Sequence, residues 1–190
     1  MPATSASSPT ASPPANNGPS AIVDTSLGSF TIQLYPSYAP KTVANFISLA
    51  KSGFYDHVVW HRIVPGFVIQ TGDPNTKNGG GDRDSWGQGT SGTSVPFEGP
   101  PGNPLTNIAG SVAMASTGAR VGGECQFYIN LVNNPSLNGN YAVFGQVTSG
   151  MDVVNALAAV SFHTSPSSPY YGQPTDPSQA LVLSVRIVGA

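Results

Sequence analysis

The sequence predicts a mainly β protein, a closed eight-stranded antiparallel β-barrel capped by two α-helices. Eight or so short segments carry strand-like apolar patterns, only two stretches have helical spacing, and the 22 glycines and 18 prolines spread turn signals along the chain. A closed barrel is favoured over a sandwich because closure removes exposed strand edges. With 190 residues the chain is long enough for one domain whose core needs neither disulfides nor metal.

Composition excludes several classes of partner. Only 8% of the residues are charged and the net charge is -2, so no basic surface is expected for nucleic acid or anionic lipid. No run of 18 apolar residues predicts a membrane span, and no intact signal peptide is recognised, so a soluble protein is expected, cytoplasmic or exported with its signal removed. The single cysteine, Cys125, is interpreted as a small hydrophobe rather than a redox switch. Nothing suggests assembly, and a monomer is expected.

The first half of the chain begins with a tail. Residues 1–20 are almost wholly Pro, Ala, Ser, Thr, Asn and Gly, and are predicted to be disordered ahead of a domain at residues 21–190. Alternating segments at 21–26 and 30–35 predict a hairpin. A helix is predicted to begin at Pro40 and end before Gly53, since the apolar residues between them recur at helical spacing: Val43, Phe46, Ile47 and Ala50.

The second half mixes short elements with two irregular stretches. Residues 72–107 and 163–179 lack periodicity, and Trp86 and Phe97 are expected to anchor the first of them. The remaining patterns predict strands at 108–114, 127–131, 142–147 and 181–188, and a short helix at 152–159.

Residues 60–71 predict a further hairpin with polar residues in an apolar ribbon. Alternation would place Trp60, Arg62 and Val64 on one face of the first strand. A two-residue turn would put Arg62 and Gln70 on opposite faces, whereas a three-residue turn sets them directly across from each other. The second register is preferred because it pairs the guanidinium with an amide carbonyl, although a solvated edge arginine remains an alternative.

The sequence lacks the residue patterns of a zinc site, a phosphate-binding loop or an activated nucleophile. The three histidines and one cysteine do not form a zinc pattern, and Gly79-Gly80-Gly81 lacks the Lys-Ser/Thr of a phosphate loop. Ser116 and Thr117 have no neighbouring base, and His61 is interpreted as a packed or hydrogen-bonded core histidine. Rotation about the amide that precedes proline needs no nucleophile, metal or cofactor, only a donor aimed at the twisted nitrogen and an apolar grip on the ring. Arg62 is the natural donor.

At these residues the chain resembles the cyclophilins, in a form similar to bacterial members. The resemblance lies in Trp60-His61-Arg62-Ile63, Pro65-Gly66-Phe67 and Gln70-Thr71-Gly72-Asp73, and continues in segments 110–115, 126–129 and 141–147. It covers roughly residues 21–188. It implies the eight-stranded barrel with two helices and peptidyl-prolyl cis-trans isomerase activity on proline-containing peptides and unfolded proteins.

The resemblance also implies roles for individual residues. Arg62 would be the catalytic donor, and Gln70 would steady it and the substrate. The remaining matched positions would bind substrate: Phe67, Val68, Ala115, Ser116, Thr117, Gln126, Tyr128, Leu137 and Tyr141. Val68 and Tyr128 stand where the family usually has Met and Phe, which reshapes the proline pocket.

Two departures from the family change what it would bind. Ser136 occupies the place of a tryptophan that contacts cyclosporin in many members, so weak binding of that drug is predicted. Residues 119–125 add one residue and two charges, Arg120 and Glu124, which would alter peptide preference. A non-catalytic proline-peptide binding module is the main alternative. A sugar-binding barrel built on Trp60, Trp86 and the pair Tyr170-Tyr171 is a weaker one.

Overall fold

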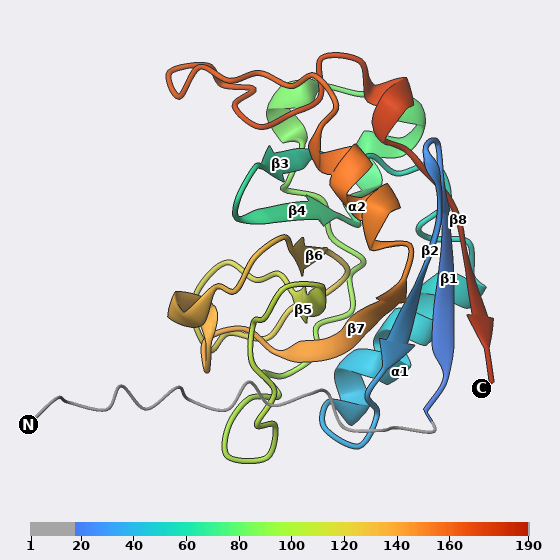
Figure 1. Ribbon diagram of the computed structural model, residues 1–190, viewed down its shortest axis with the longest axis vertical. Coiled ribbons are helices and arrows are strands. Elements are labelled where there is room, and N and C mark those ends of the chain that lie inside the picture. Colours follow the sequence, from blue (N-terminus) through green and yellow to red (C-terminus); the bar gives the residue numbers. More distant parts are fainter. Residues whose placement is uncertain (1–17, 190) are drawn as a thin grey trace, which may run out of the picture.

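Eight strands form one antiparallel sheet that curls into an open half-barrel, with two helices packed on it (Figure 1). The computed structural model describes residues 18–189. The strands are β1 Ser20–Thr25, β2 Gly28–Leu34, β3 Arg62–Val64, β4 Val68–Thr71, β5 Ser111–Met114, β6 Phe127–Asn130, β7 Val143–Ser149 and β8 Val182–Val188. The helices are α1 Pro40–Lys51 and α2 Met151–Ala158, with short 3-10 turns η1 Pro74–Gly79, η2 Arg83–Ser85, η3 Pro135–Leu137 and η4 Pro177–Ala180.

The predicted closed barrel is wrong. The strand order is β3-β4-β6-β5-β7-β2-β1-β8, so β3 and β8 are edges. Among residues 18–189, an isolated bridge, Val59 with Leu181, and adjacent backbone hydrogen bonds such as Trp60 N to Ala180 O at 2.8 Å join the two ends, without a continuous ladder. The sheet stays open because β3 begins only at Arg62, and the residues before it are too irregular to form a ladder with β8.

The predicted opening hairpin and first helix are confirmed. Strands β1 and β2 pair from Ser20 with Gln33 to Thr25 with Gly28. Helix α1 begins with Pro40, and it buries Val43, Phe46 and Ala50. The predicted tail is too long at its end, because Ser20 already belongs to β1 and the Gln33 side chain donates to Gly18 O at 2.8 Å. The rest of that predicted tail, residues 1–17, lies outside the described residues.

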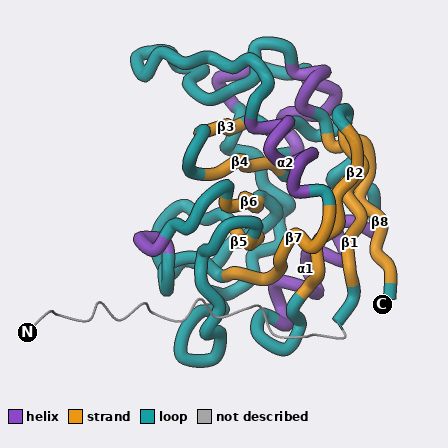
Figure 2. The backbone as a smooth tube through the Cα atoms, in the orientation of Figure 1, coloured by secondary structure: helices purple, strands orange, loops and turns teal. Residues whose placement is uncertain are grey.

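The other predicted elements are present with boundaries shifted by a few residues. The two stretches predicted to be irregular, 72–107 and 163–179, contain only isolated bridges and 3-10 turns and run over the outside of the sheet (Figure 2). Trp86 anchors the first of them, since it is only 7% exposed and belongs to the main core. Among residues 18–189 no helix is long and apolar enough to cross a membrane.

Side-chain alternation divides the sheet into two apolar faces. The main core lies inside the curl and takes residues such as Ile69, Phe127 and Phe144. Their strand neighbours Val68, Tyr128 and Val143 point outward into a smaller cluster with Ala113. The outer cluster is separate from the core that folds the domain.

Candidate functional site

Strands β3 and β4 set Arg62 directly opposite Gln70, as the preferred register predicted. Val64 pairs with Val68 across the turn, Phe67 N donates to Val64 O at 3.0 Å, and Gly66 takes a φ of 70°. The strand alternation predicted for Trp60 is wrong, since Trp60 precedes β3 and is fully buried in the main core. Arg62 is exposed, and within residues 18–189 its side chain makes no hydrogen bond or ion pair.

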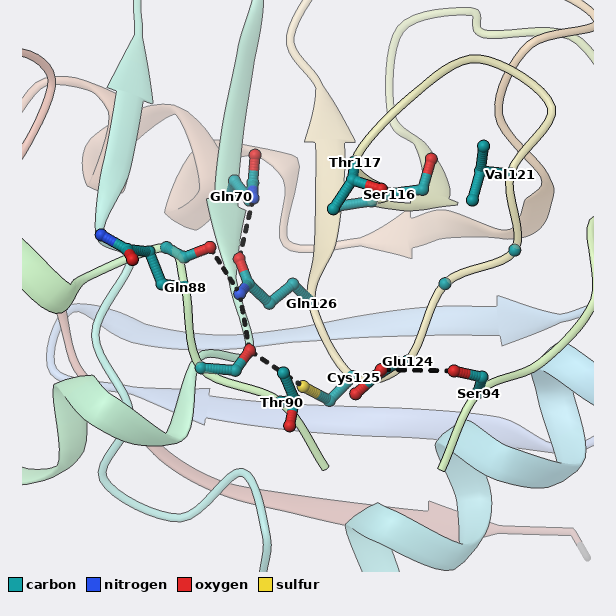
Figure 3. A pocket seen from close by; sticks show the side chains of 15 residues that line it. Gln70, Gln88, Thr90, Ser94, Ser116, Thr117, Val121, Glu124, Cys125 and Gln126 are labelled. Carbon is teal, nitrogen blue, oxygen red and sulfur yellow. Dashed lines mark hydrogen bonds between the residues drawn. The ribbon is translucent and has the colours of Figure 1, made fainter. Parts of the chain in front are cut away.

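Gln70 is held by a second glutamine rather than by the arginine. Its Nε2 donates to Gln126 Oε1 at 3.0 Å, and Gln126 Nε2 donates to the carbonyls of Gly87 and Gly89 at 3.0 Å each (Figure 3). This chain of bonds fixes both side chains on the outer surface of the sheet. The Oε1 atom of Gln70 has no donor among the described residues and is free to accept a hydrogen bond.

The outer apolar cluster lies beside this pair. Val68, Ala113, Tyr128 and Val143 are buried, and the hydrophobic residues packed on them are Phe67, Leu105, Ala115, Leu137 and Tyr141. Five residues predicted to bind substrate, Phe67, Val68, Tyr128, Leu137 and Tyr141, are thus brought together with Ala115. They form a largely apolar patch beside the Arg62–Gln70 pair, because Val68 lies two residues before Gln70 on β4 and Tyr128 pairs with Gln70 from β6.

Tyr128 is fixed within this cluster. Its hydroxyl donates to Asn107 Oδ1 at 2.9 Å, and its ring meets Tyr141 edge-on with centroids 5.9 Å apart. Burial, with a smaller contribution from Tyr141, raises the pKa of Tyr128 well above its usual range, so the phenol stays neutral. Sequence reasoning missed Leu105 and Asn107, which come from the irregular stretch 72–107 and carry no periodic signal.

A pocket of about 530 Å³ opens on the other side of Gln126. Its lining includes the remaining predicted residues, Ala115, Ser116 and Thr117, together with Gln70 and Gln126 (Figure 3). Glu124 forms one wall and is bonded through its carboxylate to Ser91 N and Ser94 Oγ at 3.2 Å each. Residues 121–125 of the unusual stretch therefore line this pocket, whereas Arg120 does not, and the predicted effect of the stretch on peptide preference stays a prediction.

Three reactive side chains at or near the pocket, Ser116, Cys125 and His61, are not prepared for covalent chemistry. Ser116 Oγ donates to Gly118 O at 2.6 Å, and burial raises the pKa of the Cys125 thiol to about 12. His61 is buried, its two ring nitrogens have no hydrogen-bond partner among the described residues, and burial lowers its pKa to about 4 despite the nearby Asp73 charge. It is the packed core histidine that the sequence predicted. In residues 18–189 no three His, Cys, Asp or Glu side chains gather as a metal site.

The site therefore combines an exposed guanidinium, a fixed glutamine and an apolar patch. An arrangement of this kind binds an apolar ring and offers a hydrogen bond beside it, without a nucleophile or a proton relay.

Comparisons with known proteins point to one family. The family model for cyclophilin type peptidyl-prolyl cis-trans isomerases matches residues 21–176. The chain is 43% identical over 139 residues to peptidyl-prolyl cis-trans isomerase-like 1 of Aspergillus fumigatus, which is 73% of this chain and 81% of that protein. It is 37% identical over 148 residues to an Arabidopsis thaliana peptidyl-prolyl cis-trans isomerase, 77% of this chain and 85% of the relative.

Solved structures give the same result. The fold is similar to that of a Cryptosporidium parvum cyclophilin type peptidyl-prolyl cis-trans isomerase, with a TM-score of 0.75 and 27% identity over 89% of this chain and 96% of the other. A second structure of that protein, determined in the presence of the dipeptide Ala-Pro, gives a TM-score of 0.74 and 27% identity over 89% of this chain and 98% of the other.

Proposed function

Because the chain belongs to the cyclophilin-type peptidyl-prolyl cis-trans isomerase family, we propose that it speeds rotation of X-Pro bonds in peptides and unfolded proteins, with Arg62 as its catalytic donor. The observation that carries the proposal is the register that sets Arg62 opposite Gln70 beside an outward apolar cluster. The reaction forms and breaks no covalent bond, which agrees with the neutral thiol and neutral imidazole nearby.

The proposed catalysis acts on the twisted amide. In the ground state the nitrogen lone pair is delocalised into the carbonyl, and rotation must cross a barrier of about 18–20 kcal/mol. At the top of that barrier the lone pair returns to the nitrogen, so a donor fixed beside it stabilises the transition state more than either isomer. The exposed guanidinium of Arg62 is unbonded within the described chain, and it therefore has donors free for this role.

The remaining residues would hold the peptide. Phe67, Val68 and Tyr128 would grip the proline ring with Leu137 and Tyr141, so that the ring stays fixed while the amide turns. Gln70 Oε1 would accept from the peptide or from Arg62, steadied by Gln126. Ala115, Ser116 and Thr117 would present backbone groups to the extended chain at the edge of the 530 Å³ pocket.

A protease-coupled isomerisation assay on an Ala-Pro-Phe peptide tests the catalytic role of Arg62. Wild-type protein should speed isomerisation, and Arg62→Ala should lower kcat/KM by about 10²–10³-fold, the usual effect of removing a transition-state donor. Arg186→Ala is the matched control, because Arg186 lies on β8 in a surface ion pair with Asp24. If wild type and Arg62→Ala both showed only the uncatalysed rate, the proposed catalysis would be wrong. The non-catalytic proline-peptide binding module would then remain as the alternative, and peptide titration would detect its binding.

We also expect weak cyclosporin binding and a monomer. Ser136 lies in η3 next to Leu137, where it offers no ring to the drug. Nanomolar cyclosporin affinity would contradict this expectation, and sedimentation would measure the oligomeric state.

A further inference from the structure

The irregular stretch after α2 lies against the strand that carries Arg62. Ile63 N donates to Gly172 O at 2.7 Å, and a Cβ placed on Gly172 would stand 3.2 Å from Ile63 O and 3.8 Å from Arg62 Cγ. Figure 1 shows this stretch running beside β3, at the edge of the sheet away from β4. The contact matters because β3 has three residues and, in the part of the chain that the structure describes, β4 is its only strand partner.

Arg83 fastens that stretch from a distant part of the sequence. Its guanidinium donates to Pro174 O at 2.9 Å and to Thr175 O at 3.4 Å, while Gln173 Nε2 donates back to Arg83 O at 3.0 Å. The guanidinium carbon also lies 4.9 Å from the ring centre of Trp86, which is anchored in the main core. Arg83 therefore links residues 172–175 to a rigid part of the molecule.

The segment that begins at Arg83 also supports β4, the other strand of the hairpin. The carbonyls of Gly87 and Gly89 hold Gln126, and Gln126 in turn holds Gln70 on β4. Gly87 N donates to the buried carboxylate of Asp73. Residues 83–89, which we name the 83–89 brace, thus reach both sides of the Arg62–Gln70 pair.

We propose that the 83–89 brace fixes Arg62 for catalysis and that Arg83 is a positioning residue, acting through residues 172–175 on the backbone of β3. The Arg62 side chain has no bonds of its own in the described chain, so its placement depends on that backbone. Residues 172–175 are also bonded to residues 161–163, so loss of the Arg83 donors would weaken rather than remove the contact of Gly172 with Ile63, and would widen the range of Arg62 positions. This inference rests on the proposed function of Arg62.

The test combines kinetics with exchange of the Ile63 amide. Arg83→Met removes the donors and keeps an unbranched side chain over Trp86, and Arg83→Lys is a milder variant that retains the charge. Arg83→Met should lower kcat by about tenfold with little change in KM, speed hydrogen exchange at Ile63, and leave the thermal midpoint near that of wild type. Arg83→Lys should give kcat and Ile63 exchange rates between those of wild type and Arg83→Met. Arg186→Ala should match wild type in all three measurements.

A double mutant shows whether Arg83 acts through Arg62. In the Arg62→Ala background, Arg83→Met should cause no further loss of activity, because the group that it positions is absent. An additional loss there, or wild-type kcat in Arg83→Met, would overturn the proposal, as would unchanged exchange at Ile63. If wild type and Arg62→Ala were equally inactive, the proposed function would fail, whereas the exchange data would still decide whether Arg83 holds β3.

Discussion

At the scale of single residues, His61 and Arg62 are neighbours in the chain with different roles. His61 affects the stability of the fold, whereas Arg62 is the proposed catalytic donor. His61 is the sequence neighbour of the exposed Arg62, yet it is buried just before β3, with both ring nitrogens unpaired among the described residues. Burial lowers its pKa from 6.5 to about 4, so the folded protein keeps the ring neutral at pH 5–7. The unfolded chain takes up a proton in that range, and protonation therefore favours unfolding.

We predict that acid destabilises the protein through His61. The free energy of unfolding should fall as the pH drops from 6.5 towards 4, by roughly 3 kcal/mol in total, and His61 should add nothing outside that window. Thermal unfolding of wild type and His61→Gln at several pH values between 4.5 and 7.5 measures the effect. The variant should lose most of the slope, whereas His163→Gln should retain it.

The Asp24 carboxylate titrates below this window. Asp24, whose pKa is lowered mainly by the Ser29 hydrogen bond, contributes stability that is lost only below its ordinary value of 3.8. Equal pH slopes for wild type and His61→Gln would show that His61 is not the group responsible.

The residue-scale predictions from sequence succeeded where local chemistry decides the outcome. The length of the Pro65-Gly66-Phe67 turn determines the register of Arg62, and turn length can be read from sequence. Alternation failed at Trp60 because the strand begins two residues later, which depends on what the indole packs against. The partner of Gln70 was also missed, since Gln126 and Gln70 are joined only by folding.

At the scale of elements, α1 is capped by a residue far away in sequence. Its cap position is Ala39, which offers no side-chain acceptor, and Pro40 follows. Instead Glu98 accepts hydrogen bonds from Lys41 N at 3.0 Å and from Thr42 N at 2.8 Å. The helix was predictable from its apolar spacing. The cap was not, because Glu98 lies 56 residues after Thr42 in sequence and only folding brings the two together.

Removing the Glu98 carboxylate should therefore destabilise α1. Glu98→Ala leaves two amide donors unpaired and removes a negative charge at the helix N-terminus, so we expect a loss of about 1–2 kcal/mol in the free energy of unfolding. Urea denaturation would measure it, with Asp84→Asn as a control, because the carboxylate of the exposed Asp84 accepts no hydrogen bond from residues 18–189. An unchanged denaturation midpoint for Glu98→Ala would refute the capping role.

At the scale of the whole molecule, the sheet protects its edges without closing. The sequence argument favoured closure as the way to remove edges, but here irregular chain covers them: residues 57–60 bond to the start of β8, and Gly172 bonds to β3. Such cover comes from long-range contacts that leave no pattern in sequence. The outer face of the curl is thereby left to carry the site, and the inner face carries the core.

This division predicts that neighbouring residues on β4 affect different properties. Ile69 points into the main core and Val68 into the outer cluster, and both are at most 2% exposed. Ile69→Val should lower the free energy of unfolding by about 0.5–1.5 kcal/mol and leave kcat/KM per folded molecule unchanged. Val68→Ala should raise KM severalfold, because it removes a wall of the proposed proline pocket. Urea denaturation and the isomerisation assay on both variants measure the two effects, and equal losses of kcat/KM would show that the two faces are not independent.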